Sequence, residues 1–136
     1  MNRNESYDRN IYYEFGKQGL IGAGLSWNNN DPISSTASGL ICKEVERVDS
    51  SFRSMLSVQS SLVTWPIHTY GTEQLKKRVL DKLISGEFVG CFGLTEPDHG
   101  SDPGSMATTA RKDVIFKPLS KLFIFLIGEF LGFEWK

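Results

Sequence analysis

The chain has 136 residues, with 15 Lys and Arg against 16 Asp and Glu, which gives a net charge of −1. This length suffices for one modest domain with its own hydrophobic core and is too short for two complete domains. A nearly neutral chain has no overall field to hold nucleic acid or an anionic membrane. Hydrophobic residues make up 40% and charged residues 23%, a balance that excludes a disordered chain and is typical of globular proteins.

The first helix is predicted within residues 5–20, where apolar side chains recur at helical spacing. A polar loop follows, and Asp31 before Pro32 is the expected cap of a second helix, since proline suits the first helical position. This helix is predicted to end near Val48. Its expected apolar stripe consists of Ala37, Leu40, Ile41, Val45 and Val48.

A third helical segment is predicted at roughly 53–69. It contains Pro66, which should bend or end the helix because proline lacks a backbone N–H and clashes with the preceding turn. Gly71 is the expected stop. Thr72 is the expected cap of a fourth helix, and Gly86 is its expected end.

The character of the chain changes after the fourth helix. Residues 88–94 form a compact apolar run that predicts a β-strand, 95–105 predict a turn-rich loop, and 106–110 are a candidate second strand. Residues 114–136 hold five of the nine Phe and follow neither the helical nor the strand period. Their apolar core is shorter than the ~20 residues that cross a bilayer as a helix, so a membrane anchor is the less favoured interpretation.

The two cysteines, Cys42 and Cys91, lie in apolar runs without metal-ligand spacing around them. We expect buried, reduced thiols in a reducing compartment, with a disulfide as the alternative. The first residues have no apolar stretch of the kind found in a secretory signal and do not have the composition of a transit peptide.

The predicted loop at 95–105 holds much of the side-chain chemistry. Ser101, His99 and Asp102 are the residue types of a catalytic triad, but neighbours in sequence do not give triad geometry. Asp98, His99 and Asp102 are a weak metal-binding set, because a single His stands with two carboxylates, and no metal site is predicted. The glycines and hydroxyls favour a cradle for an anion or cofactor, and an ordinary Gly/Pro turn is the competing interpretation.

The string from Gly90 to Pro97, GCFGLTEP, is followed after two residues by Gly100, Ser101 and Asp102. This pattern resembles the flavin-binding signature of the acyl-CoA dehydrogenase family. Upstream, residues 44–63 resemble the glutaryl-CoA dehydrogenases of that family, and the resemblance covers about residues 8–112. It implies a mainly α fold, in which the N-terminal helical domain of the family is followed by the first strands of its middle β domain, truncated.

The resemblance implies FAD as the cofactor. Thr95 would contact the flavin ring, and Ser101 would lie at the pyrophosphate and close to the CoA thioester. The residues that the resemblance places on FAD are Phe92, Gly93, Leu94, Thr95, Glu96, Pro97, Asp98, His99, Gly100 and Ser101.

Arg53 and Ser54 match the positions that hold the distal carboxylate of the substrate in glutaryl-CoA dehydrogenases, so the resemblance implies glutaryl-CoA as the substrate, with Ser101 also in contact with it. A fixed, permanently charged, bidentate donor suits a carboxylate in a largely dry pocket. Glu46 is expected to position the arginine or tune its charge. The competing interpretation is a surface ion pair of Arg53 with Glu46 or Asp49.

The activity that the resemblance implies is oxidative decarboxylation of glutaryl-CoA to crotonyl-CoA and CO2, in lysine and tryptophan degradation. FAD would take the hydride, and electron-transferring flavoprotein would accept the electrons. The resemblance further implies the mitochondrial matrix as the location and a homotetramer as the family assembly, an assembly that is doubtful for so short a chain.

The sequence departs from the family after Asp113. We therefore expect a helical domain at 1–87, the start of a middle β domain with the flavin-binding loop at 88–113, and a divergent hydrophobic tail at 114–136. No residue matches the catalytic glutamate of the family, so no catalytic residue is assigned and the chain alone is expected to be inactive and to bind flavin weakly or not at all. The alternatives are a non-catalytic module from a truncated product, which binds acyl-CoA or another subunit, and a membrane-attached helical protein.

Overall fold

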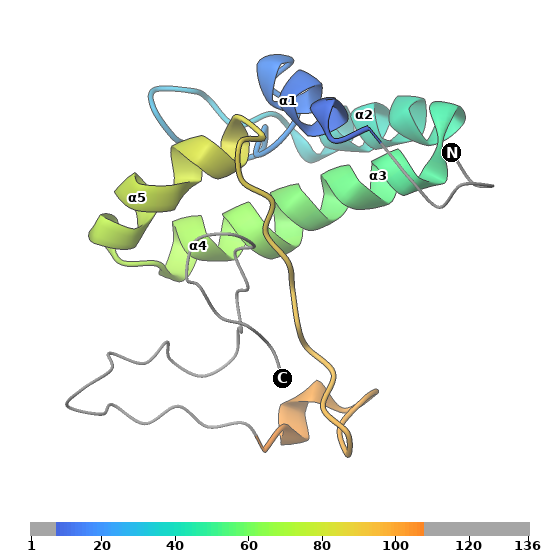
Figure 1. Ribbon diagram of the computed structural model, residues 1–136, viewed down its shortest axis with the longest axis vertical. Helices are drawn as coiled ribbons and strands as arrows, with labels where there is room; N and C mark the ends of the chain where they lie inside the picture. Colours follow the sequence, from blue (N-terminus) through green and yellow to red (C-terminus); the bar gives the residue numbers. More distant parts are fainter. Residues whose placement is uncertain (1–7, 108–136) are drawn as a thin grey trace.

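The computed structural model describes residues 8–107. Within them, the chain forms α1 (Asn10–Lys17), α2 (Ser35–Val48), α3 (Ser50–Ser57), α4 (Trp65–Tyr70) and α5 (Glu73–Ile84). The π-helix η2 (Val58–Thr64) joins α3 to α4, and a short 3-10 helix, η3 (Pro103–Ser105), lies near the end of the described part. Helices α3, η2 and α4 form one continuous rod, with α2 packed along α3 and α5 packed against α4 (Figure 1).

The rod passes through Pro66, so the third helix does not end there, which was one of the two predicted effects of this proline. In η2 the backbone bonds to the carbonyl five residues back, and the Trp65 N–H accordingly donates to the Ser60 carbonyl. Proline interrupts an α-helical pattern because its N–H is missing. A change to π hydrogen bonding directly before Pro66 shifts the pattern by one residue, and the helix resumes as α4.

The ends of α5 are those that the sequence predicted. The Thr72 hydroxyl accepts a hydrogen bond from the Leu75 N–H at 3.3 Å, which satisfies one of the unpaired donors of the first turn. Helix α4 ends at Tyr70, directly before Gly71. Gly86 follows the end of α5 with φ of +78°, the left-handed conformation that glycine adopts at low cost.

Helix α2 begins at Ser35, so Asp31 is not its cap, contrary to prediction. The Ser34 hydroxyl accepts a hydrogen bond from the Ala37 N–H at 3.1 Å and caps the helix instead. The N–H of Ile33 donates to the Ala23 carbonyl at 3.0 Å and so holds the preceding residues in the loop.

Replacement of the true cap should weaken α2. We expect Ser34→Ala to lower the free energy of unfolding by about 1 kcal/mol, because an N–H of the first turn loses its acceptor. Asp31→Ala is the matched control, and it should change the free energy by less than about 0.5 kcal/mol. Urea unfolding curves of the two variants measure the difference, and an equal loss in both would contradict the assignment of Ser34.

The core lies between the rod and α5. It is a cluster of side chains that are at most 3% exposed: Val63, Ile67, Val79, Leu80 and Leu83. Helix α2 contributes no fully buried residue. In its predicted apolar stripe Leu40 is 57% and Val48 77% exposed, and the other three residues are half-buried. Removal of apolar surface from water therefore stabilises the rod and α5 far more than α2.

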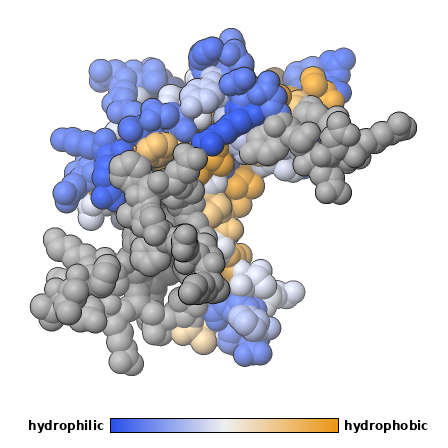
Figure 2. Space-filling model, in the orientation of Figure 1, coloured by the Kyte–Doolittle hydropathy of each residue, from blue (hydrophilic) through white to orange (hydrophobic). Residues whose placement is uncertain are grey.

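The segment at 88–94 crosses the rod as an extended chain (Figure 1). The prediction of strands here is wrong for the described residues, in which the structure has single-residue bridges and no named strand. A strand needs a neighbouring backbone to complete its hydrogen bonds, and at Gly90 the side chain of Gln59 takes that place. Apolar surface follows this segment across the molecule (Figure 2). The candidate second strand, at 106–110, lies mostly outside the described residues, and the predicted tail lies wholly outside them.

Candidate functional site

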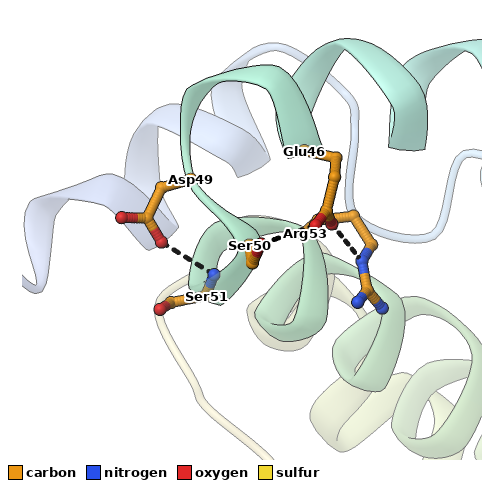
Figure 3. Close-up of polar contacts among 5 residues, drawn as sticks. All are labelled: Glu46, Asp49, Ser50, Ser51 and Arg53. Atoms are coloured by element: carbon orange, nitrogen blue, oxygen red, sulfur yellow. Dashed lines mark hydrogen bonds and ion pairs between the residues drawn. The ribbon is translucent and has the colours of Figure 1, made fainter.

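Arg53, in the first turn of α3, forms an ion pair with Glu46, in the last turn of α2 (Figure 3). Its Nε donates to Oε2 of Glu46 at 2.7 Å, and the Ser50 hydroxyl donates to Oε1 of the same carboxylate at 2.5 Å. Asp49, the other partner considered from the sequence, instead caps α3 by accepting from the Ser51 N–H at 2.7 Å. The corner between α2 and α3 therefore separates the two carboxylates, and of the two only Glu46 pairs with Arg53.

The arginine keeps part of its donor capacity. The pair uses Nε, and the two terminal nitrogens of Arg53 point away from Glu46 (Figure 3). The side chain is 39% exposed, and that of Glu46 is 43% exposed. Ser54, the next residue, is exposed as well. A carboxylate that approaches this corner can thus reach guanidinium N–H groups that the ion pair leaves uncommitted.

The hydrogen bonds of the corner also favour the charged forms of its side chains. The Ser50 hydroxyl, and after it the Arg53 guanidinium, hold the pKa of Glu46 below its usual value of 4.5. The hydrogen bond to Glu46 and its negative charge raise the pKa of Arg53 above its already high ordinary value. Both shifts favour the charged forms that a glutamate and an arginine already have at neutral pH. The guanidinium is oriented by a carboxylate that is fixed in turn by Ser50.

This geometry predicts a pH-dependent stability. Because the folded-state pKa of Glu46 is lowered, its contribution is fully present above the unfolded-state pKa, near 4.5, and is lost as the pH falls through the folded-state value. We expect wild type to be more stable than Glu46→Gln at pH 7, and the difference to shrink toward about pH 3, as measured by urea unfolding. Glu44→Gln, which breaks the more exposed pair with Arg47, is the control and should change stability little at either pH. If the stability difference between wild type and Glu46→Gln were the same at both pH values, the role of Glu46 would be contradicted.

A cleft of about 100 Å³ extends the seam between α2 and α3. Cys42, four residues before Glu46, and Ser57, four residues after Arg53, are among its lining residues, so it begins one helical turn from the ion pair. Cys42 is half-buried and Cys91 is exposed, and neither forms a disulfide in the part of the chain that the structure describes. The prediction that Cys91 is buried is wrong for the described residues, in which no named strand covers the apolar segment that carries it.

The predicted flavin-binding residues lie at the far end of the extended segment. A tight turn from Glu96 to His99 is closed by reciprocal backbone hydrogen bonds of 3.2 Å, and the Glu96 carboxylate accepts from the Ala107 N–H at 2.8 Å. Thr95 and Ser101 are exposed, and a side chain at Gly100 would meet no atom within 4 Å. The loop thus has exposed hydroxyls and an open backbone position around a closed turn.

The same loop gives no support to a triad or a metal site. The Asp102 carboxylate accepts from the Ser105 hydroxyl at 2.6 Å rather than from Ser101 or His99. Residues 8–107 contain no group of three or more His, Cys, Asp or Glu arranged to hold a metal ion. Over the same residues, no helix combines the length and the apolar character that crossing a membrane requires.

The two parts of the candidate site are not brought together by the described residues. Arg53 and Ser54 lie on α3, whereas the segment at 92–101 leaves the helices (Figure 1). No hydrogen bond or ion pair in the described part of the chain joins Arg53 or Ser54 to this segment.

Sequence reasoning missed Gln59, whose side chain is 3% exposed and bonds to the extended segment. The sequence does contain a signal that could have identified Gln59. Gln59 falls between Leu56 and Val63 at a spacing of three and four residues, so it is a polar residue on an otherwise apolar helical face.

Comparison with known proteins shows which family has these features. The sequence profile described as Acyl-CoA dehydrogenase, N-terminal domain, matches residues 1–87. An acyl-CoA dehydrogenase of Bacillus subtilis (strain 168) is 33% identical over 113 residues, which are 82% of this chain and 30% of that protein. A glutaryl-CoA dehydrogenase of Desulfococcus multivorans is 43% identical over 75 residues, or 55% of this chain and 19% of that protein.

A solved structure agrees with these matches. The glutaryl-CoA dehydrogenase of Mycobacterium smegmatis in complex with FADH2 is 41% identical, with a TM-score of 0.75, over 82% of this chain and 29% of that chain. The chain therefore spans about a third or less of the relatives that it matches. Helices α1 to α5 all lie within the residues that match the N-terminal domain, and the chain belongs to the acyl-CoA dehydrogenase family.

Proposed function

We propose that this chain carries the carboxylate-binding part of a glutaryl-CoA dehydrogenase and the beginning of its FAD site. The observation that carries the proposal is the arrangement of Arg53, which Glu46 holds by Nε while its terminal nitrogens point away. Arg53 and Ser54 would bind the distal carboxylate of glutaryl-CoA. A saturated acyl chain without that carboxylate would give the guanidinium nothing to bind.

The family uses FAD. The exposed hydroxyls of Thr95 and Ser101 and the open backbone at Gly100 fit a flavin nucleotide, because they supply donors without a side chain in the way. In the proposal, residues Phe92 to Ser101 contact FAD, and Ser101 also contacts the substrate. When bound, FAD supplies the acceptor for the hydride that leaves the β-carbon of the acyl group.

The protein side chains then have distinct tasks. Glu46 orients Arg53, Arg53 anchors the substrate by its distal end, and Ser54 offers a second donor. The group that removes the α-proton is not assigned to this chain. Crotonyl-CoA and CO2 as products, electron-transferring flavoprotein as acceptor, a tetrameric assembly and the mitochondrial matrix belong to the proposal for the whole enzyme. The division at 1–87, 88–113 and 114–136 also belongs to the proposal.

A non-catalytic module that binds acyl-CoA or another subunit is the second candidate. It is favoured by the separation of Arg53 from the segment at 92–101 within the described residues (Figure 1). Turnover of glutaryl-CoA with an artificial electron acceptor distinguishes an enzyme from such a module.

We expect the 136-residue chain by itself to produce no crotonyl-CoA and to retain little flavin after purification with excess FAD. The physical reason is that an exposed turn binds only one side of a flavin, and that no base in this chain is assigned to the α-proton. The measurements are flavin absorbance per mole of chain and product analysis with the artificial acceptor. Stoichiometric flavin or measurable turnover would contradict this expectation.

The substrate part of the proposal is tested by binding alone. Glutaryl-CoA should bind the chain more tightly than pentanoyl-CoA, which has the same chain length and a methyl group in place of the carboxylate. Isothermal titration calorimetry gives both dissociation constants, and equal values would overturn the assignment of Arg53.

A further inference from the structure

Gln59 makes an unusual pair of hydrogen bonds for a side chain in the core. Its Nε2 donates to the Gly90 carbonyl at 2.7 Å, and its Oε1 accepts from the Gly90 N–H at 3.0 Å. A carboxamide offers one face with a donor and an acceptor, as a backbone residue does. Gln59 therefore gives Gly90 the two hydrogen bonds that an antiparallel neighbouring strand would give.

Close packing fixes the same point of the segment. Gly90 is buried, and a Cβ on it would lie 2.3 Å from Cγ1 of Val63, which is fully buried in η2. Glycine is thus required for the segment to come this near to the rod. Two residues earlier, the Phe88 N–H donates to the Lys82 carbonyl at 2.9 Å, so the segment is also tied to α5.

From these contacts we infer that Gln59 is a positioning residue, which sets the register in which the chain enters the segment at 92–101. The identity of that segment as FAD-binding rests on the proposed function. Only one residue separates Gly90 from Phe92, so the chain has little length in which to recover its register after a shift at Gly90. In an extended chain a shift of one residue turns every following side chain to the opposite face. A slip at Gly90 would therefore turn Thr95 away from the side on which it now lies.

A purely structural role for Gln59 makes a different prediction. If the amide only satisfied polar atoms in the core, its loss would lower the stability of the whole domain and leave the order of the distal segment unchanged. If it sets the register, its loss frees the distal segment while the helices keep their structure. Backbone dynamics, measured residue by residue, distinguish the two roles.

The test uses the 136-residue chain labelled with ¹⁵N, with NMR order parameters for residues 91–101 and for α5. In wild type we expect rigid values, about 0.8 or higher, from Gly90 through the Glu96–His99 turn. In Gln59→Leu the values for 91–101 should fall below about 0.6, whereas those of α5 stay rigid. Thr64→Val is the matched control. Thr64 is another buried polar residue of η2, and its hydroxyl donates to the Ser60 carbonyl at 2.9 Å. Its replacement by valine should leave residues 91–101 rigid.

Gln59→Glu keeps the shape of the side chain and gives a rescue. An ionised carboxylate can accept from the Gly90 N–H but cannot donate to its carbonyl, and burial raises the pKa of an introduced carboxyl group. We expect a mobile segment near pH 8 and recovery of the wild-type order parameters toward about pH 5, where the carboxylic acid donates again. Wild type, measured at the same pH values, should show no such change.

The outcomes separate this inference from the proposed function. Mobility of 91–101 in Gln59→Leu, with recovery of Gln59→Glu at low pH, supports the positioning role. Unchanged order in both variants, or an equal loss in Thr64→Val, overturns it. A fold too unstable to measure in Gln59→Leu leaves the decision to Gln59→Glu, whose failure to recover would also overturn it. A separate titration of FAD into wild type reports only on the proposed cofactor contact.

Discussion

Gly86→Ala should lower the free energy of unfolding by about 2 to 5 kcal/mol, an amount large enough to unfold much of a marginally stable domain. A non-glycine residue at φ of +78° costs about 1 to 2 kcal/mol. The added Cβ would also lie 2.2 Å from the backbone oxygen of Tyr12, a buried residue of α1, and such overpacking costs about 1 to 3 kcal/mol. Since backbone is not free to swing aside as a side chain is, α1 must move away from the end of α5. Urea unfolding and far-ultraviolet circular dichroism measure the loss.

A second glycine tests the same contact between α1 and the end of α5, this time from the side of α1. A Cβ on Gly16, in α1, would lie 2.2 Å from the backbone oxygen of Ser85, so Gly16→Ala should be destabilising as well. The matched control is Gly39→Ala in α2, where the new methyl group would meet no atom within 4 Å. This control should raise stability by about 0.5 to 1 kcal/mol, because alanine is the better helix former. If all three variants changed stability alike, the close approach of α1 to α5 would be wrong.

The features that the sequence predicted well depend on neighbouring residues. Thr72 reaches an N–H three residues away, and Gly86 adopts a conformation that its own lack of a side chain permits. The error over the cap of α2 has the same local scale, because Ser34 stands only three residues after Asp31. The hydrogen bond from the Ile33 N–H to the Ala23 carbonyl holds the residues before Ser34 in the loop.

The features that the sequence did not predict depend on residues that are far apart. Pro66 is a reliable helix breaker for α hydrogen bonding, and nothing near it in sequence announces a turn of π-helix. The run at 88–94 has the composition of a strand, but a strand is defined by its partner. Gln59, 31 residues earlier, supplies the hydrogen bonds at Gly90, and a pairing over this distance cannot be derived from local pattern.

The candidate site likewise has features that the sequence predicted and features that it did not. The sequence left Arg53 with either Glu46 or Asp49 as a partner, and the corner between α2 and α3 decides for Glu46 because Asp49 is engaged with the Ser51 N–H. The part played by Ser50 in holding Glu46 was not predicted, since it requires the exact direction of a hydroxyl at a helix start. The roles of Arg53 and of the segment at 92–101 in binding remain predictions.

Arg53→Gln should remove the preference of the chain for glutaryl-CoA over pentanoyl-CoA. A hydrogen bond to a charged group is worth about 1.5 to 3 kcal/mol, which corresponds to about 10- to 150-fold in dissociation constant. Because Arg53 is 39% exposed in the described structure, water competes for the carboxylate and the lower part of this range is expected. Affinity for pentanoyl-CoA should stay within about twofold of wild type, since its terminal methyl group makes no bond to the guanidinium.

Two further variants separate geometry from charge in this prediction. Arg53→Lys keeps the positive charge but offers a point donor in place of a planar fork, so it should retain only part of the preference. Arg47→Gln removes a nearby arginine that pairs with Glu44 on the exposed side of α2, and it should leave the preference unchanged. If Arg47→Gln and Arg53→Gln reduced the preference equally, general attraction between a basic surface and an anionic ligand would explain the binding. In that case the orientation of Arg53 by Glu46 would have no part in selecting the substrate.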